Sequence, residues 1–158
     1  MTSIGEYAFS ECSNLTGVTI PSKVTSIEQY TFSNCSKLKD VKISSGVTSI
    51  GELAFWQCNS LTKITIPSNV TSIKNGAFSS CANLSQVTLS SGVTTIENYA
   101  FYYDSKLSKI NIPASVTYIG DFAFQYCSKN LVITIETNTD TFTYLKSIYG
   151  SKYKIILR

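Results

Sequence analysis

Apolar residues return at a fixed spacing of 23 positions along most of the chain. Each unit opens with a valine, and an isoleucine, a phenylalanine and a leucine follow after three, eight and 14 residues. The four columns are Val24, Val47, Val70, Val93 and Val116; Ile4, Ile27, Ile50, Ile73, Ile96 and Ile119; Phe9, Phe32, Phe55, Phe78, Phe101 and Phe124; and Leu15, Leu38, Leu61, Leu84 and Leu107. Self-similarity at a fixed period of this length indicates a repeat protein.

One unit, residues 61–83, shows what each repeat is expected to form. Ile64 and Ile66 alternate with polar residues, which is the pattern of a short strand with one buried face. After a proline turn, residues 70–73 make a second extended segment, and residues 77–81 space their apolar groups as on one helical turn. Such a unit cannot bury its apolar side alone, so it is stable only when stacked on its neighbours. The sequence therefore predicts a solenoid of short parallel strands.

The period covers residues 1–135 as six units, of which the first is truncated, and it breaks afterwards. In residues 136–158 we expect a C-terminal cap made of a helix and a strand. The helix should begin at Asp140 or Thr141 and end at Gly150. Phe142, Leu145 and Tyr149 lie on one side of this helix, which we expect to be buried. Ile156 lies one period after Ile133, so we expect the strand to add a further rung in register.

Two stretches carry a family resemblance: LTKITIPSNVTSIKNGAFSSC at residues 61–81 and KLSKINIPASVTYIGDFAF at residues 106–124. They resemble the BspA-type leucine-rich repeat, whose pattern is L-x-x-V-x-I-P-x-x-V-x-x-I-x-x-x-A-F-x-x-C. The resemblance implies a right-handed leucine-rich-repeat solenoid, with short parallel strands and a helical turn in each rung. The chain begins inside a unit, and we expect it to be a fragment of a longer protein.

The resemblance also implies a function. Members of the family are mostly surface or secreted proteins of bacteria and of some parasitic protists, and they are associated with adhesion. We therefore expect a non-enzymatic, protein-binding module that lies at the cell surface or outside the cell and contacts a host or neighbouring-cell protein. The alternative is a purely structural spacer within a larger surface protein, with no ligand of its own.

Composition and charge argue against several other classes of function. The 13 basic and ten acidic residues are scattered, without the basic runs that favour nucleic acid or anionic lipid. No apolar run approaches the roughly 18 residues of a membrane span, so no membrane insertion is expected. The chain has no histidine, which removes the usual general base and the commonest zinc ligand. We therefore predict no catalytic site, no cofactor and no metal.

All five cysteines lie in one column of the repeat. The remaining position of that column, between Cys81 and Cys127, is an aspartate, Asp104. Residues one period apart stack in parallel, whereas a disulfide or a zinc site needs converging side chains. We interpret Cys12, Cys35, Cys58, Cys81 and Cys127 as buried free thiols that act as small hydrophobic groups. A carboxylate among them would be costly, so the turn at Asp104 is expected to open toward water.

The outward positions of the first strand in each unit are the first place to look for a binding face. In leucine-rich repeats this face usually carries the binding surface, and here it is made of hydroxyls, amides and lysines. The candidate protein-binding residues are Lys39, Lys42, Lys63, Thr65, Thr88, Lys109 and Asn111. Their plainer interpretation is a solvated face of β-forming residues, together with Thr19 and Thr134.

Three aromatic residues interrupt a run of small polar positions in the turns and form a second candidate. We interpret Trp56, Tyr103 and Tyr126 as a possible aromatic interaction patch. The neighbouring Tyr7, Tyr30, Tyr99 and Phe122 are instead expected to pack against adjacent rungs.

The N-terminal end offers a third interaction surface. Its first rung, made of Ile4, Phe9, Leu15, Val18 and Ile20, has nothing stacked before it in this chain. Repeat proteins need a polar terminal cap for solubility. We therefore expect an end-to-end homodimer through the uncapped N-terminal rung, because a two-fold pairing of two such ends closes.

Overall fold

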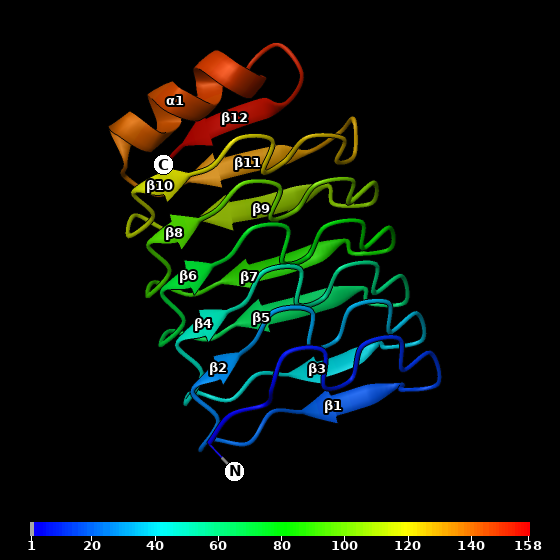
Figure 1. Ribbon diagram of the computed structural model, residues 1–158. Helices are drawn as coiled ribbons and strands as arrows, with labels where there is room; N and C mark the ends of the chain where they lie inside the picture. Colours follow the sequence, from blue (N-terminus) through cyan, green and yellow to red (C-terminus); the bar gives the residue numbers. More distant parts are fainter. Residues whose placement is uncertain (1) are drawn as a thin grey trace.

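The computed structural model describes residues 2–158 as a stack of rungs, with the N-terminus at one end and the C-terminus near the other (Figure 1). Each rung carries a longer strand and a two-residue strand on opposite sides of its winding, except that the helix α1 follows the last longer strand in place of a short strand. The longer strands are β1 (Gly17–Thr19), β3 (Asp40–Lys42), β5 (Lys63–Ile66), β7 (Gln86–Leu89), β9 (Lys109–Ile112) and β11 (Val132–Ile135). The short strands are β2 (Ser26–Ile27), β4 (Ser49–Ile50), β6 (Ser72–Ile73), β8 (Thr95–Ile96) and β10 (Tyr118–Ile119).

All strand pairs within the stack are parallel and keep the 23-residue register. Ile64 of β5 pairs with Val87 of β7, and Val87 pairs with Ile110 of β9. The predicted solenoid of parallel strands is therefore confirmed. The short strands form one sheet from β2 to β10, but the longer strands form two sheets, because β3 does not pair with β5.

The core is the set of columns that the sequence predicts. Five phenylalanines, Phe32, Phe55, Phe78, Phe101 and Phe124, are fully buried. Their rings stack from rung to rung: the centroids of Phe55 and Phe78 lie 5.2 Å apart with the planes almost parallel. Valine, isoleucine and leucine of each unit surround this stack, so that burial of apolar area against the neighbouring rungs stabilises every unit.

The segments predicted as helical turns are not helices. Each has two residues with positive φ, such as Tyr99 at 58° and Tyr103 at 62°. These left-handed residues break the helical path, and alternate amides turn toward the next rung. The amides of Phe101 and Tyr103 donate to the carbonyls of Ala123 and Gln125, both at 2.9 Å. The turns therefore form a third hydrogen-bonded ladder along the stack.

The cap contains a helix, α1 (Thr139–Tyr149), and a strand, β12 (Lys154–Leu157). Asn138 is the N-cap and accepts a hydrogen bond from the Thr141 amide, so the helix begins earlier than expected. Gly150 ends the helix, and Leu145 and Tyr149 are buried against the last rung.

The predicted register of the last strand is wrong by one residue. Ile155, and not Ile156, pairs with Ile133, so the offset from β11 to β12 is 22 residues. The side chains alternate between the two faces of a strand, so this shift buries Ile155 and leaves Ile156 on the outer side. The helical insertion before β12 sets this register, because the strand no longer follows a repeat unit.

The cysteine column differs from the prediction at two positions, Cys12 and Asp104. Cys35, Cys58, Cys81 and Cys127 are buried free thiols, but Cys12 in the first rung is exposed, since no rung precedes it. Asp104 does not open toward water: it is fully buried, and its Oδ1 accepts a hydrogen bond of 2.9 Å from the Cys81 amide. Its other oxygen, Oδ2, has no partner among residues 2–158.

Across residues 2–158, no helix combines the length and apolarity that a membrane span requires.

Candidate functional site

The residues predicted for protein binding all lie on the outer side of the longer strands. Lys42 belongs to β3, Thr88 to β7, and Lys39 directly precedes β3. The strands β5 and β9 each contribute a pair, Lys63 with Thr65 and Lys109 with Asn111. Every one of these seven side chains is exposed, whereas the alternate residues of the same strands point into the core. We call this surface the strand face; it comprises these seven residues.

The strand face ends at β11. Thr134 was expected to be exposed in the same row, but only 3% of it is accessible. Its register partners are Asn111 on one side and Ile156 of β12 on the other. Because Ile156 places a branched apolar side chain next to it, Thr134 is covered. The polar surface therefore runs from β1 to β9.

Two of the shallow hollows along the longer strands are each lined by three or more strand-face residues. One of about 540 Å³ lies over β7 and β9 and includes Thr88, Lys109 and Asn111. The other, of about 180 Å³, lies over β3 and β5, where the ladder of longer strands is interrupted. Lys39, Lys42, Lys63 and Thr65 line it. The structure thus groups three of the four candidate lysines around the break in the sheet.

The strand face is positively charged. It holds four lysines, and Asp40 of β3 is an exposed carboxylate beside them. The ion pair found in residues 2–158 joins Lys74 and Glu97, so none of the four lysine ammonium groups is neutralised by a salt bridge within that part of the chain. An acidic surface is the electrostatic complement of such a face.

The structure brings together two of the three residues of the predicted aromatic patch. Tyr103 and Tyr126 are about half exposed, and their ring centroids lie 4.7 Å apart. Trp56 occupies the position next to its phenylalanine, one residue earlier in its unit than Tyr103, and it has no ring contact with either tyrosine. Tyr102 takes its place, because its ring lies edge-on to both Tyr103 and Tyr126.

Rings of the preceding column stack on their neighbours, as expected. The centroids of Tyr7 and Tyr30 are 4.8 Å apart, and those of Tyr99 and Phe122 are 5.3 Å apart. All but Tyr30 remain exposed. The ammonium of Lys152 lies 5.0 Å above the ring of Tyr126, which adds a cation–π contact at the edge of the patch.

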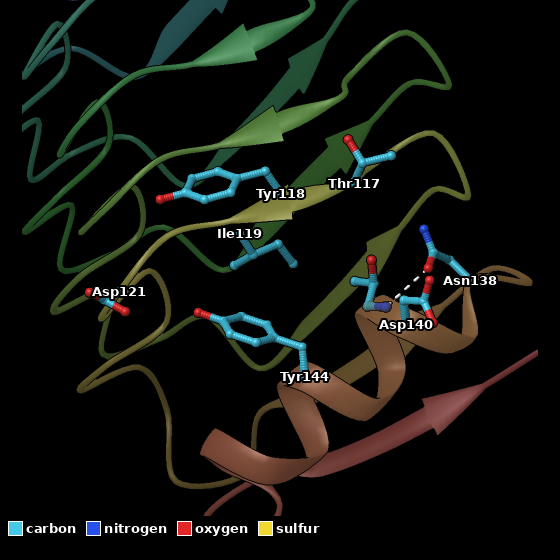
Figure 2. Close-up of a pocket in the computed structure, with 8 residues that line it drawn as sticks. Thr117, Tyr118, Ile119, Asp121, Asn138, Asp140 and Tyr144 are labelled. Atoms are coloured by element: carbon cyan, nitrogen blue, oxygen red, sulfur yellow. Dashed lines mark hydrogen bonds between the residues drawn. The ribbon is translucent and has the colours of Figure 1, made fainter.

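A groove between β10 and α1 was not predicted from the sequence. It has a volume of about 420 Å³ and is lined by residues of the last short strand and of the helix: Thr117, Tyr118, Ile119, Asp121, Asn138, Asp140, Thr141 and Tyr144. Figure 2 shows the rings of Tyr118 and Tyr144 on the two sides of this groove. One signal for it exists in the sequence, because Tyr118 replaces the serine or threonine of the other units.

The buried thiols are poorly suited to nucleophilic chemistry. Burial raises the pKa of Cys35 to about 11 and holds the pKa of Cys81 well above its usual range, so these groups stay protonated at neutral pH. Their hydrogens point to backbone oxygens, as in the 3.1 Å contact from Cys81 Sγ to Phe55 O. Among residues 2–158, no three His, Cys, Asp or Glu side chains gather as a metal site.

Comparisons with known proteins agree with this architecture. The family model described as the BspA type leucine rich repeat region matches residues 2–147 in six copies. A leucine rich cell surface protein of Faecalibacterium prausnitzii is 37% identical, with a TM-score of 0.61 over 85% of this chain and 43% of that protein. The leucine rich repeat protein of T. pallidum is 27% identical, with a TM-score of 0.83 over 100% of this chain and 81% of that protein.

The pneumococcal vaccine antigen PcpA is also 27% identical, with a TM-score of 0.75 over 87% of this chain and 36% of that protein. The chain therefore spans less than half the length of two of these three proteins. No curated protein matches the sequence significantly. Six repeat copies across nearly the whole length, with the fold of bacterial leucine-rich-repeat proteins, show that the chain belongs to the BspA-type leucine-rich repeat family.

Proposed function

We propose that this chain is a non-enzymatic, protein-binding module of a surface or secreted protein, and that the strand face holds the partner. The observation that supports this most is the strand face itself: seven exposed polar residues, six in four parallel strands and Lys39 just before β3, whose four lysines form no salt bridge within residues 2–158. The similarity to a cell surface protein and to an antigen supports the compartment. The partner in this proposal is a host or neighbouring-cell protein with an acidic surface.

Charge complementarity sets the expected behaviour of such a complex. Positive and negative patches raise the rate of association and fix the orientation of the partner, and salt screens them over about 8–10 Å. Binding through Lys39, Lys42 and Lys63 should therefore weaken as the salt concentration rises. Thr65, Thr88 and Asn111 would supply hydrogen bonds at the centre of the contact.

A charge-reversal experiment tests the proposal. The 158-residue chain is titrated against a panel of extracellular-matrix proteins and host cells, and the triple variant Lys39→Glu, Lys42→Glu, Lys63→Glu is compared with it. We expect saturable binding by the original chain and a loss of about tenfold or more in affinity for the triple variant, which corresponds to at least about 1.4 kcal/mol.

A matched control removes the effect of net charge. Lys37, Lys106 and Lys129 are exposed and lie outside the strand face, so their reversal to glutamate changes the net charge equally. This control should keep the affinity of the original chain. If the original chain unfolds cooperatively on heating but binds no member of the panel, the structural spacer would instead be favoured.

A further inference from the structure

The groove between β10 and α1 occupies the place of a missing short strand. In the lower rungs, two carbonyls of each short-strand segment accept amides from the next rung. Thr94 O accepts from the Thr117 amide at 2.9 Å, and Ile96 O accepts from the Gly120 amide at 2.8 Å. The same pair of bonds recurs in the rungs below, from Thr71 to Thr48 O and from Lys74 to Ile50 O.

At β10 this series stops. The equivalent carbonyls belong to Thr117 and Ile119, and within residues 2–158 no further rung donates to them. The hydrogen bonds from the cap go to carbonyls that precede them: Asn138 Nδ2 and Thr141 Oγ1 donate to Val116 O at 2.9 and 3.0 Å, and Asn138 Nδ2 also lies 3.4 Å from Ala114 O. The longer-strand sheet continues into β12, whereas β10 is the last strand of the short-strand sheet (Figure 1). The open edge of β10 lies beside the groove.

The walls of the groove indicate what kind of chain would fit this edge. Tyr118 and Tyr144 expose 52% and 37% of their surface, and Figure 2 shows their rings on opposite sides of the groove. Asp121 lies on the side of the tyrosine hydroxyls, and Asp140 lies at the helix N-terminus, next to Asn138 (Figure 2). The groove therefore combines aromatic walls with a carboxylate at either end.

No cationic residue balances these carboxylates. The lining contains neither lysine nor arginine, and the ion pair found in residues 2–158 involves Lys74 and Glu97 only. Asp140 gains some stabilisation from the helix N-terminus, but Asp121 has no such neighbour. Open carbonyls, carboxylates and aromatic faces share one preference, for donors and positive charge.

We propose that the groove binds an extended peptide segment of a partner, carrying arginine or lysine, which adds to β10 as a further rung. Its backbone amides donate to Thr117 O and Ile119 O, as the amides of each rung do to the rung below. Its cationic side chain lies between the rings of Tyr118 and Tyr144 and reaches Asp121. The volume of about 420 Å³ is within the range of roughly 300–1,000 Å³ that is usual for ligand sites. This site is separate from the strand face and does not depend on the function proposed for it.

The test uses the whole chain and a blocked seven-residue peptide of alternating threonine and arginine. Binding is measured by titration calorimetry, with the threonine–glutamate peptide of equal length as the charge control. A third peptide has N-methyl groups on alternate backbone amides, which removes the donors but keeps the side chains. We expect the arginine peptide to bind and the other two to bind at least tenfold more weakly.

Variants of the protein separate the groove from the rest of the surface. The double variant Asp121→Asn, Asp140→Asn should weaken the arginine peptide about tenfold, and Tyr118→Ser should weaken it several-fold. All three side chains are exposed, so thermal unfolding should be unchanged in Tyr118→Ser and only slightly lowered in the double variant, which loses the favourable charge of Asp140 at the helix N-terminus. The control is Asp40→Asn on β3, which should leave the affinity unaltered. Equal binding of the three peptides, no binding of the arginine peptide at millimolar concentration, or the same affinity in the double variant would overturn the proposal.

Discussion

Asp104→Cys is the substitution whose effect the structure defines best. Asp104 interrupts a column of thiols and is fully buried, and its Oδ2 has no partner among the described residues. Burial raises the pKa of its carboxyl well above the usual range, and the hydrogen bond from the Cys81 amide offsets this only in part. A cysteine would restore the column. By analogy with Cys127, whose thiol donates to Phe101 O at 3.1 Å, the new thiol would donate to Phe78 O.

Two contributions set the size of the effect. Removing a buried oxygen without a partner should stabilise the fold by about 1–3 kcal/mol. The second contribution depends on pH. The folded carboxyl keeps a proton that the unfolded chain releases above its pKa of about 3.9, so the stability contributed by the neutral acid is complete below that pH. It is lost as the pH rises toward the raised pKa of the folded state, at about 1.4 kcal/mol per pH unit.

Urea unfolding, followed by circular dichroism at several pH values between 4 and 7, measures both contributions. The variant should be more stable at every pH, and its advantage should grow with pH. A new cysteine does not titrate in this range, so the slope reports Asp104 alone. Asp104→Asn is the matched control: it lacks the titration but keeps an acceptor for the Cys81 amide. A difference between Asp104→Cys and the original chain that does not change with pH would refute the reasoning.

Three further predictions concern the core and the ends of the stack. Phe55→Ala should lower the free energy of unfolding by about 3–5 kcal/mol in urea titrations, because it opens a cavity in the phenylalanine stack; a loss below about 1 kcal/mol would contradict this packing. Thiol titration should count one fast group in the native protein, the exposed Cys12, and five groups after unfolding; a lower final count would reveal disulfides. The isolated 158-residue chain should dimerise in sedimentation experiments through the first rung, where Tyr7 is 55% and Phe9 38% exposed, and Val18→Lys should reduce the mass; an unchanged mass would exclude this end as the interface.

Much of the fold follows from the sequence because its main determinant is periodic. The phenylalanine and isoleucine columns fix both the register and the buried side of every rung, and Phe55 stacks on Phe78 as predicted. The turns could not be predicted in the same way. Tyr99 and Ser80 adopt positive φ without the glycine that usually signals it, since the inter-rung ladder imposes this backbone.

The candidate sites also differ in whether a periodic feature of the sequence determines them. Six of the seven strand-face residues follow from strand alternation, and Lys39, which precedes β3, is exposed outside that pattern. The groove was missed because it depends on how α1 crosses β10, and that geometry is not periodic. The prediction for Asp104 was wrong for a different reason. It assumed that the cost of burying a carboxyl would make the turn open toward water, but the core column and the hydrogen bond from the Cys81 amide keep the side chain buried.

The interruption between β3 and β5 leaves one junction of the solenoid with fewer hydrogen bonds between neighbouring rungs. A stack in which each rung touches only its neighbours opens wherever a junction is weakest. At this junction the short strands, the turn ladder and the phenylalanine stack remain, but the longer-strand ladder does not. We therefore expect the two N-terminal rungs to behave as one foldon, which separates from the other rungs before these unfold. In native-state hydrogen exchange, the amides of β1 and β3 should exchange together and faster than those of β7, through a sub-global opening.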